Sequence, residues 1–298
     1  MPAASDPRDR PIAVFDSGVG GLTVLHELLV HLPQEDFVYL GDTARFPYGQ
    51  RSTAELEGFA LQIAEELAHR RAKLLVVACN TMTAAALPAL QRRMLETTLG
   101  VDVIGVVRPE ALHAVAATRN GRIGLLATPA TVASGAYADA VAAVDSHVDL
   151  VAVPCPDLAP LIQDPPGGAA GELFTPRLQD AVRAYTAPLV EARADTVILG
   201  CTHYPLVRPM LQRMLGRDVT IVTSGAALAR QVEHALGSRD LAARRSTGEG
   251  TYSFLCTGDV EAFRALGTRF LQMPLTEVEH VALGPTTTTE VHPAWPRP

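Results

Sequence analysis

Two cysteines follow short apolar runs that have the composition of buried β-strands. The run at residues 74–78 leads directly into Cys79. The run at residues 196–199 leads, after one glycine, into Cys201, and hydroxyl, amide or imidazole side chains follow both cysteines. Open α/β folds place their ligand crevice at the carboxyl ends of parallel strands, so we expect both thiols at such an edge.

A pair of thiols on opposite sides of one ligand suits proton transfer at a stereocentre. One cysteine, as thiolate, removes a proton from one face of a carbon, and the other, as thiol, supplies a proton to the opposite face. The thiolate needs a polar or electropositive setting near neutral pH. Asp16 and His203 are the candidates for tuning the two thiols, although a lone histidine near a strand end is more often a structural hydrogen-bond partner.

The other two cysteines, Cys155 and Cys256, also follow strand-like runs. Cys155 stands between two prolines, without a hydroxyl or amide neighbour. A small buried thiol behaves as an apolar core residue, so we interpret both as structural. The four cysteines are widely spaced and form no C-x-x-C pair. This pattern argues against a structural zinc site or a disulfide framework and favours free thiols in a cytosolic enzyme.

Strand-like runs alternate with helical patterns along the chain, and this order is typical of parallel α/β sheets. We expect two similar parallel-sheet α/β domains with the active site in the cleft between them. The expected limits are 11–105 plus 221–281 for a discontinuous first domain, 106–220 for the second, and disordered tails at 1–10 and 284–298. The predicted strands are 11–15, 37–40, 74–78, 101–106, 123–127, 148–153, 196–199, 219–222 and 252–255, and the predicted helices are 22–29, 52–70, 83–95, 172–194, 226–236 and one ending at 271.

The first predicted strand runs into a glycine-rich loop at residues 16–21, and a helix follows. This order can hold an anion, because backbone N–H groups and a helix N-terminus converge there. Thr23 stands where a dinucleotide fingerprint needs its third glycine, and no Gly-Lys-Ser/Thr follows as in a Walker loop. Taken alone, the loop is better interpreted as a tight turn in which Asp16 or Ser17 satisfies backbone amides.

The amino-acid composition and net charge of the chain argue against several classes of protein. The chain has 298 residues, 48% of them hydrophobic and 19% charged, which suits two globular domains. The net charge of −7 argues against a nucleic-acid surface or binding to anionic lipid. No apolar run approaches the roughly 20 residues of a membrane helix, and the first ten residues lack the apolar core of a signal peptide.

Lys73 is the single lysine of the chain. A pyridoxal phosphate enzyme needs a lysine for its Schiff base. Lys73 begins the strand that ends near Cys79, and at about 3.3 Å per residue it lies roughly 20 Å away, at the wrong end of the sheet. Pyridoxal chemistry at the cysteine site is therefore not expected.

Four segments resemble the cofactor-independent aspartate/glutamate racemase superfamily. They are IAVFDSGVGGLTVL (12–25), YLGDTARFPYG (39–49), VVACNTMTA (76–84) and ILGCTHYPL (198–206). The resemblance covers all the expected site segments in the expected order. It implies two α/β domains with the site between them, no metal, no pyridoxal phosphate, and racemisation of L- and D-glutamate.

The resemblance also implies roles for individual residues. Cys79 and Cys201 are the expected bases, with Asp16 and His203 as their respective supporting groups. The implied substrate-binding residues are Ser17, Tyr48, Gly49, Asn80, Thr81, Thr131 and Thr202. The family makes D-glutamate for peptidoglycan in the bacterial cytoplasm, often as a homodimer. We therefore expect glutamate as substrate and a second copy of the chain as partner, without nucleic acid or membrane.

Two segments depart from the family pattern. Residues 155–163, CPDLAPLIQ, end in Gln163 where the family usually has glutamate, and residues 106–114, VVRPEALHA, lack the usual Glu-Pro-Gly. Neither touches the cysteines, and both bear on site electrostatics and domain contact.

Three alternative functions stay open at this point. A sister racemase acting on aspartate or another acidic amino acid has the same chemistry and differs in pocket length. A non-catalytic amino-acid binding protein would have no need of paired thiols. A cysteine hydrolase would use one nucleophile with a histidine base and leave the second thiol unexplained.

Overall fold

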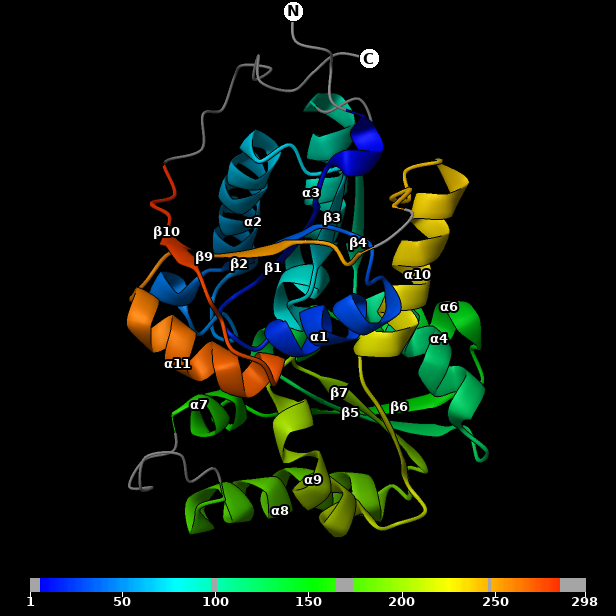
Figure 1. Cartoon of the computed structure of the whole chain (residues 1–298). Helices are drawn as coiled ribbons and strands as arrows, with labels where there is room; N and C mark the ends of the chain where they lie inside the picture. The colour runs from blue at the N-terminus through cyan, green and yellow to red at the C-terminus, as the bar shows by residue number, and fades with distance from the viewer. Residues whose placement is uncertain (1–5, 98–100, 165–173, 246–247, 285–298) are drawn as a thin grey trace, which may run out of the picture.

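The fold consists of two parallel β-sheets with helices packed on both faces of each (Figure 1). The computed structural model describes residues 6–97, 101–164, 174–245 and 248–284. Residues 1–5 and 285–298 of the predicted tails, 1–10 and 284–298, lie outside the described residues, and so does the glycine- and proline-containing segment 165–171, where the sequence predicts a loop. Every strand pair within the two sheets is parallel, as the alternation of strands and helices predicted.

The first sheet has six strands and is built from both ends of the chain. In spatial order they are β10 (Val278–His280), β9 (Tyr252–Cys256), β2 (Phe37–Gly41), β1 (Ile12–Asp16), β3 (Leu74–Val77) and β4 (Asp102–Gly105). Because β9 pairs with β2, the chain returns to this sheet after building the second one.

The second sheet has four strands from the middle of the chain. In spatial order they are β6 (Asp149–Pro154), β5 (Arg122–Ala127), β7 (Thr196–Gly200) and β8 (Thr220–Val222). Since β8 pairs with β7, the chain leaves this sheet after Val222.

The central strands are apolar at successive positions because both faces of each sheet are buried. On β1, Ile12 and Val14 face one core cluster, while Ala13 and Phe15 face another. On β7, Val197 and Ile198 likewise belong to different clusters. The continuous apolar runs ahead of the two cysteines are therefore the expected sequence of strands buried on both sides.

Helices complete the layers. In the first sheet's half, α2 (Thr53–His69) and α3 (Asn80–Thr97) pack on one face, and α1 (Leu22–His31) and α11 (Val260–Leu271) on the other (Figure 1). In the second, α8 (Pro176–Glu191) and α9 (Arg208–Leu215) cover one face, and α4 (Val107–Ala117) and α6 (Ala136–Val144) the other. The shorter or connecting elements are α5 (Pro129–Ala133), α7 (Leu158–Gln163), α10 (Gly225–Ser238), η1 (Pro7–Asp9), η2 (Thr43–Arg45) and η3 (Tyr204–Val207).

Several elements differ from the sequence-based prediction. Residues 7–9 of the predicted disordered leader form η1, which Asp6 caps by accepting from the Arg8 N–H. Helix α3 begins at Asn80 instead of 83 and continues through Pro88. Helix α8 begins at Pro176, with Thr175 as its N-cap. The helices α4, α5, α6, α7 and α9 and the strand β10 were not predicted.

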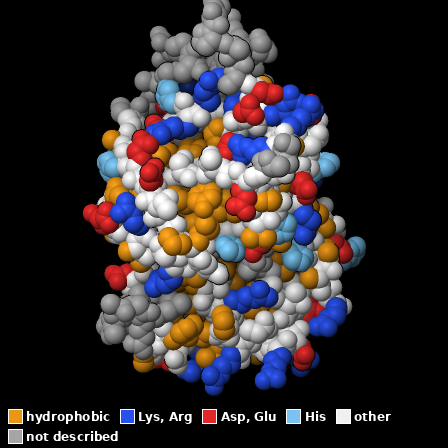
Figure 2. Space-filling view, viewed as in Figure 1, with side chains coloured by type: hydrophobic (Ala, Val, Ile, Leu, Met, Phe, Trp, Pro, Cys, Tyr) orange, Lys and Arg blue, Asp and Glu red, His pale blue; other side chains and the backbone are white. Residues whose placement is uncertain are grey.

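None of the helices in the described ranges is both long and apolar enough to cross a membrane. Acidic and basic side chains are interspersed with apolar ones on the face shown in Figure 2.

Candidate active site

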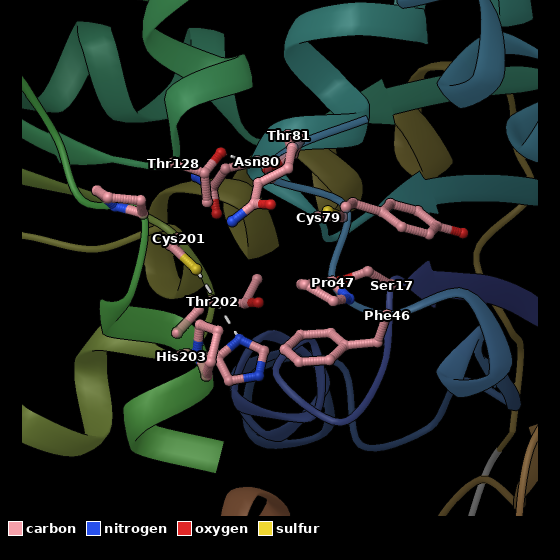
Figure 3. A pocket seen from close by; sticks show the side chains of 16 residues that line it. Ser17, Phe46, Pro47, Cys79, Asn80, Thr81, Thr128, Cys201, Thr202 and His203 are labelled. Carbon is pink, nitrogen blue, oxygen red and sulfur yellow. Dashed lines mark hydrogen bonds between the residues drawn. The ribbon is translucent and has the colours of Figure 1, made fainter. Parts of the chain in front are cut away.

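Cys79 and Cys201 line one pocket at the carboxyl ends of the two sheets (Figure 3). Cys79 lies between β3 and α3, and Cys201 follows β7. Figure 3 shows them on opposite walls of the pocket. The chain thus brings together two thiols that are far apart in sequence, one from each sheet.

Most of the predicted site residues meet at this pocket. Those that line it are Ser17, Tyr48, Gly49, Cys79, Asn80, Thr81, Cys201, Thr202 and His203. Asp16 and Thr131 are not among the lining residues, but each is hydrogen-bonded to one: Asp16 accepts from the Thr202 hydroxyl, and the Thr131 hydroxyl donates to that of Thr81. The lining residues that sequence reasoning missed are Phe46, Pro47, Gln50, Thr128, Pro156, Ala159 and Pro160.

The Cys79 thiol stands at the N-terminus of α3. The backbone N–H of Met82 donates to its sulfur over 3.5 Å. Burial, with a contribution from the nearby Asp16 carboxylate, raises the pKa of Cys79 to about 12, although hydrogen bonds from Met82 and Ser17 act to lower it. The helix N-terminus thus partly offsets the cost of a buried thiolate.

Asp16 closes β1 beside Cys79 and is almost fully buried. The Gly18 N–H donates to its Oδ2 over 3.0 Å, which confirms the tight-turn interpretation of the glycine loop. Burial raises its pKa, and hydrogen bonds from the backbone of Gly21 and Gly18 and from the Cys79 side chain lower it. Asp16 is therefore held where its charge acts on the first thiol.

On the other wall, the Cys201 sulfur lies 3.8 Å from Nδ1 of His203. Burial raises the pKa of Cys201 well above its usual range, and the charge of Cys79 adds to this rise. Burial lowers the pKa of His203 to about 3, with a contribution from the positive charge of Arg269. Nε2 of His203 lies 3.0 Å from Oε1 of Gln163, the residue that departs from the family pattern.

The glycine loop reaches across to the second wall. A Cβ added at Gly20 would lie 2.4 Å from Oγ1 of Thr202 and 2.5 Å from Nδ1 of His203. The Thr23 hydroxyl also meets the Thr202 carbonyl at 3.2 Å. Only glycine fits this close approach, so the loop holds the Cys201 segment against the first sheet.

Three threonine hydroxyls form a buried cluster beside Asn80. Oγ1 of Thr128 lies 2.9 Å from Oγ1 of both Thr81 and Thr131, and the latter two are 3.1 Å apart. Thr128 also caps α5, since its side chain accepts from the Thr131 N–H. Its Thr-Pro sequence at the end of β5 is an N-cap signal that could have identified it.

The Tyr48 hydroxyl already has a hydrogen-bond partner within the protein. This hydroxyl donates to Asp42, which also receives a hydrogen bond from Arg45 at 2.6 Å. Burial raises the pKa of Tyr48 well above its usual range. The phenol is thus engaged by Asp42 although the residue lines the pocket.

The single lysine is engaged elsewhere. Nζ of Lys73 lies 2.5 Å from Oε2 of Glu35, and both side chains are buried. Lys73 also donates to the carbonyl of Arg8 at 2.7 Å. These contacts place it just before β3, at the end of the strand opposite Cys79, as its sequence position predicted.

Comparison with known proteins decides the family. The sequence profile described as Asp/Glu/Hydantoin racemase matches residues 23–232. The chain belongs to this racemase family. A glutamate racemase from Geobacter metallireducens is 41% identical over 274 residues, which cover 92% of this chain and 97% of that protein.

Solved structures of family members agree with the fold. The crystal structure of glutamate racemase isoform RacE1 from Bacillus anthracis superposes with a TM-score of 0.84 at 36% identity, covering 93% of this chain and 98% of the other. The glutamate racemase from Francisella tularensis, crystallised in complex with D-glutamate, superposes with a TM-score of 0.83 at 30% identity, with the same coverage. The chain is thus an amino-acid racemase of two-domain α/β architecture, which excludes the non-catalytic binding protein and the cysteine hydrolase.

Proposed function

We propose that the chain interconverts L-glutamate and D-glutamate by moving a proton at Cα between Cys79 and Cys201, without a metal ion or organic cofactor. The observation that carries the proposal is the pair of thiols on opposite walls of one pocket in a member of a racemase family. Relatives that match along most of the chain are glutamate racemases, one of them crystallised with D-glutamate.

The proton transfer balances without a further reactant. The Cys79 thiolate takes the Cα proton of D-glutamate, and the electron pair of the broken C–H bond stays on carbon. The Cys201 thiol then gives its proton to the opposite face, which forms the C–H bond of L-glutamate and leaves a thiolate at Cys201. The reverse reaction uses the same two groups with their roles exchanged.

Asp16 and His203 support the two thiols in this proposal. Asp16 lies beside Cys79, and its negative charge opposes a second negative charge there, which strengthens Cys79 as a base. His203 lies beside Cys201, with its Nδ1 facing the sulfur. At neutral pH the buried imidazole is uncharged, so it can accept the thiol proton in a hydrogen bond.

The polar wall around Thr81 provides donors for the carboxylates of the substrate. Its hydroxyls lie within one buried cluster, next to the backbone of Gly49, which approaches Thr128 closely. The residues proposed to bind substrate are Ser17, Tyr48, Gly49, Asn80, Thr81, Thr131 and Thr202, to which the geometry adds Thr128.

The wider role also belongs to the proposal. The enzyme would act in the cytoplasm as a homodimer and supply D-glutamate for peptidoglycan synthesis. Rescue of a bacterial strain that requires D-glutamate tests the role, and sedimentation of the purified chain tests the dimer. A purely monomeric active enzyme would refute the dimer, and failure of an active enzyme to rescue growth would refute the role.

The first experiment follows optical rotation when the purified chain, treated with a chelator and a carbonyl reagent, is given L-glutamate or L-aspartate. We expect loss of rotation with glutamate and slow or no loss with aspartate. Equal rates would favour the broader acidic-amino-acid racemase. Activity that depends on added metal or pyridoxal phosphate would refute the cofactor-independent mechanism.

The second experiment separates the two thiols by exchange in D₂O, monitored by NMR. A Cys201→Ala variant should exchange the α-proton of D-glutamate only, and a Cys79→Ala variant that of L-glutamate only, both with little net racemisation. The Cys155→Ser variant is the matched control and should exchange both enantiomers. If either alanine variant exchanges both at similar rates, one base reaches both faces and the paired-thiol mechanism is wrong.

A further inference from the structure

Glu110 on α4 is a fully buried carboxyl group that no part of the proposed proton transfer uses. It lies in the segment that departs from the family's usual Glu-Pro-Gly. Three side chains from separate elements donate to it. The Tyr137 hydroxyl from α6 donates to Oε2, the Ser224 hydroxyl before α10 donates to Oε1, and Nδ2 of Asn80 lies 3.3 and 3.2 Å from the two oxygens.

These contacts fix the orientation of the Asn80 amide. An ionised carboxylate only accepts hydrogen bonds, so it must face the amino group of Asn80. The Tyr137 hydroxyl gives its proton to Glu110, and its oxygen accepts from the same Nδ2 at 2.7 Å. If the Asn80 amide were reversed, its Oδ1 would face the Glu110 carboxylate and the Tyr137 oxygen, and neither has a proton to donate to it.

The other end of the amide is consequently unpaired. Oδ1 of Asn80 is buried and has no hydrogen-bond partner among the described residues. Asn80 is about 1% exposed and lines the pocket, where Figure 3 shows it between the two cysteines. A buried carbonyl oxygen without a donor destabilises the protein, so this position favours a ligand that brings an N–H group.

Resting on the proposed function, we infer that Glu110 is a positioning residue that keeps Oδ1 of Asn80 turned toward the substrate, where it accepts a hydrogen bond from the α-ammonium group. An acidic amino acid offers two carboxylates, which only accept, and one ammonium, which only donates. A fixed acceptor therefore selects the ammonium and sets which way the substrate lies. The negative charge of Glu110 behind the amide adds to this preference.

The test is Glu110→Gln in the full chain, with binding of D-glutamate and of glutarate measured by calorimetry. Glutarate has both carboxylates and no ammonium. Burial raises the pKa of Glu110 to about 7, so binding is measured at pH 8.5, where the wild-type carboxylate is ionised. The glutamine amide presents a donor to the Asn80 amino group, which drives that amide to turn. We expect the Kd for D-glutamate to rise about tenfold and that for glutarate to stay within about twofold.

Tyr137→Phe is the second variant. It keeps the Glu110 carboxylate and removes the hydroxyl that accepts from Asn80 and donates to Glu110. Tyr137→Phe should raise the Kd for D-glutamate about two- to threefold and leave the Kd for glutarate unchanged. If Glu110→Gln does not fold, this variant alone tests whether the orientation of Asn80 selects the ammonium group. Glu66→Gln on α2, which pairs with Arg70 outside the pocket, is the matched control and should change neither Kd.

Unchanged D-glutamate binding in the folded variants would overturn the inference. An equal loss of D-glutamate and glutarate binding would also overturn it. That result would mean that the substitution disturbs the pocket wall as a whole, and not the orientation of the Asn80 amide alone. Wild-type racemisation of glutamate is measured alongside. A wild type that racemises glutamate while Glu110→Gln keeps its Kd refutes only the role of Glu110, whereas a wild type that binds neither ligand refutes this role and the proposed function together.

Discussion

The Gln163→Glu substitution tests the electrostatics of the Cys201 wall. In the structure Oε1 of Gln163 lies 3.0 Å from Nε2 of His203. An amide oxygen only accepts, so Nε2 carries the ring proton and Nδ1 presents its lone pair to the Cys201 thiol. Burial lowers the pKa of His203 to about 3, so this imidazole is neutral across the working pH range.

A glutamate at the same place puts a negative charge next to the ring. Two unit charges 3.0 Å apart attract by about 5 kcal/mol at an effective dielectric constant of about 20, which corresponds to roughly 4 pKa units. Position 163 is half-buried, and solvent screening reduces this value to between about 2 and 4 units. The pKa of His203 should therefore rise from about 3 to between about 5 and 7.

The change should be visible in two measurements. NMR titration of the His203 ring, assigned with a His203→Asn variant, gives the pKa directly. The pH profile of kcat/KM from L-glutamate should gain an ionisation near pH 5–7, because an imidazolium beside Cys201 stabilises its thiolate. Gln179→Glu adds the same charge at an exposed position of α8 that does not line the pocket, and it should leave both measurements unchanged.

Two results would refute this reasoning. A His203 pKa that stays below about 4 in Gln163→Glu would show that the introduced carboxylate does not face Nε2 as the amide does. A wild-type His203 that titrates near its ordinary value of 6.5 would show that burial does not suppress its charge.

Three further predictions follow from other parts of the structure. Cys155→Ser and Cys256→Ser should keep kcat within a few-fold, since neither thiol lines the pocket, and steady-state kinetics check this. Gly20→Ala should cost about 1–3 kcal/mol in unfolding free energy and lower kcat, because its Cβ would lie 2.4 Å from Oγ1 of Thr202. Glu110 has a folded-state pKa of about 7 against an ordinary value of 4.5, so its contribution to stability is full below pH 4.5 and is lost as pH rises through 7. Denaturant melts should show a decline of about 3 kcal/mol over this range that Glu110→Gln flattens.

Each of these three predictions has a control variant or a result that would contradict it. A loss of several orders of magnitude in kcat by a folded Cys155→Ser protein would contradict its structural role. A Cβ at Gly58 in α2 would meet no heavy atom within 4 Å, so Gly58→Ala should be neutral or stabilising. An identical pH dependence of stability in Glu110→Gln and wild type would show that Glu110 does not titrate in this window.

The features of the site that could be predicted are those that depend on a few consecutive residues. An apolar run buried on both faces, followed by Cys79 or Cys201, marks a strand and its carboxyl end within a few residues. Parallel sheets then bring such ends to one edge without further information. The predicted strands and the two thiols at the pocket follow from these rules.

The parts that were missed depend on contacts between distant segments. Glu110 has the sequence of an ordinary charged helix residue, and only the packing of α4 against α3, α6 and the start of α10 buries it. Gln163 was noted as a departure from the family pattern, but its contact with His203, forty positions further along the chain, could not be predicted. Neither could the hydrogen bond that the Tyr48 hydroxyl donates to Asp42.

The short helices were missed for a related reason. The segments that form α5 and α7 have five and six residues, too few to show a helical period. Helix α4 starts beyond a strand without a capping side chain. Its sequence carries little amphipathic signal because α10, α6 and β7 pack around it, so apolar residues are needed on more than one side.

The raised pKa values of the two thiols fit the proposed mechanism because of how they are coupled. Proton transfer through a carbanion needs one thiolate and one thiol at the same time. The negative charge of Cys79, once ionised, raises the pKa of Cys201, so a state with both thiols ionised is disfavoured. In the singly ionised state that reacts, the pair holds one proton between its two sulfurs, and the ionisation belongs to the pair and not to either cysteine. The same repulsion that makes each thiolate rare also makes it a stronger base, and it keeps the opposite thiol protonated as the acid that completes the reaction.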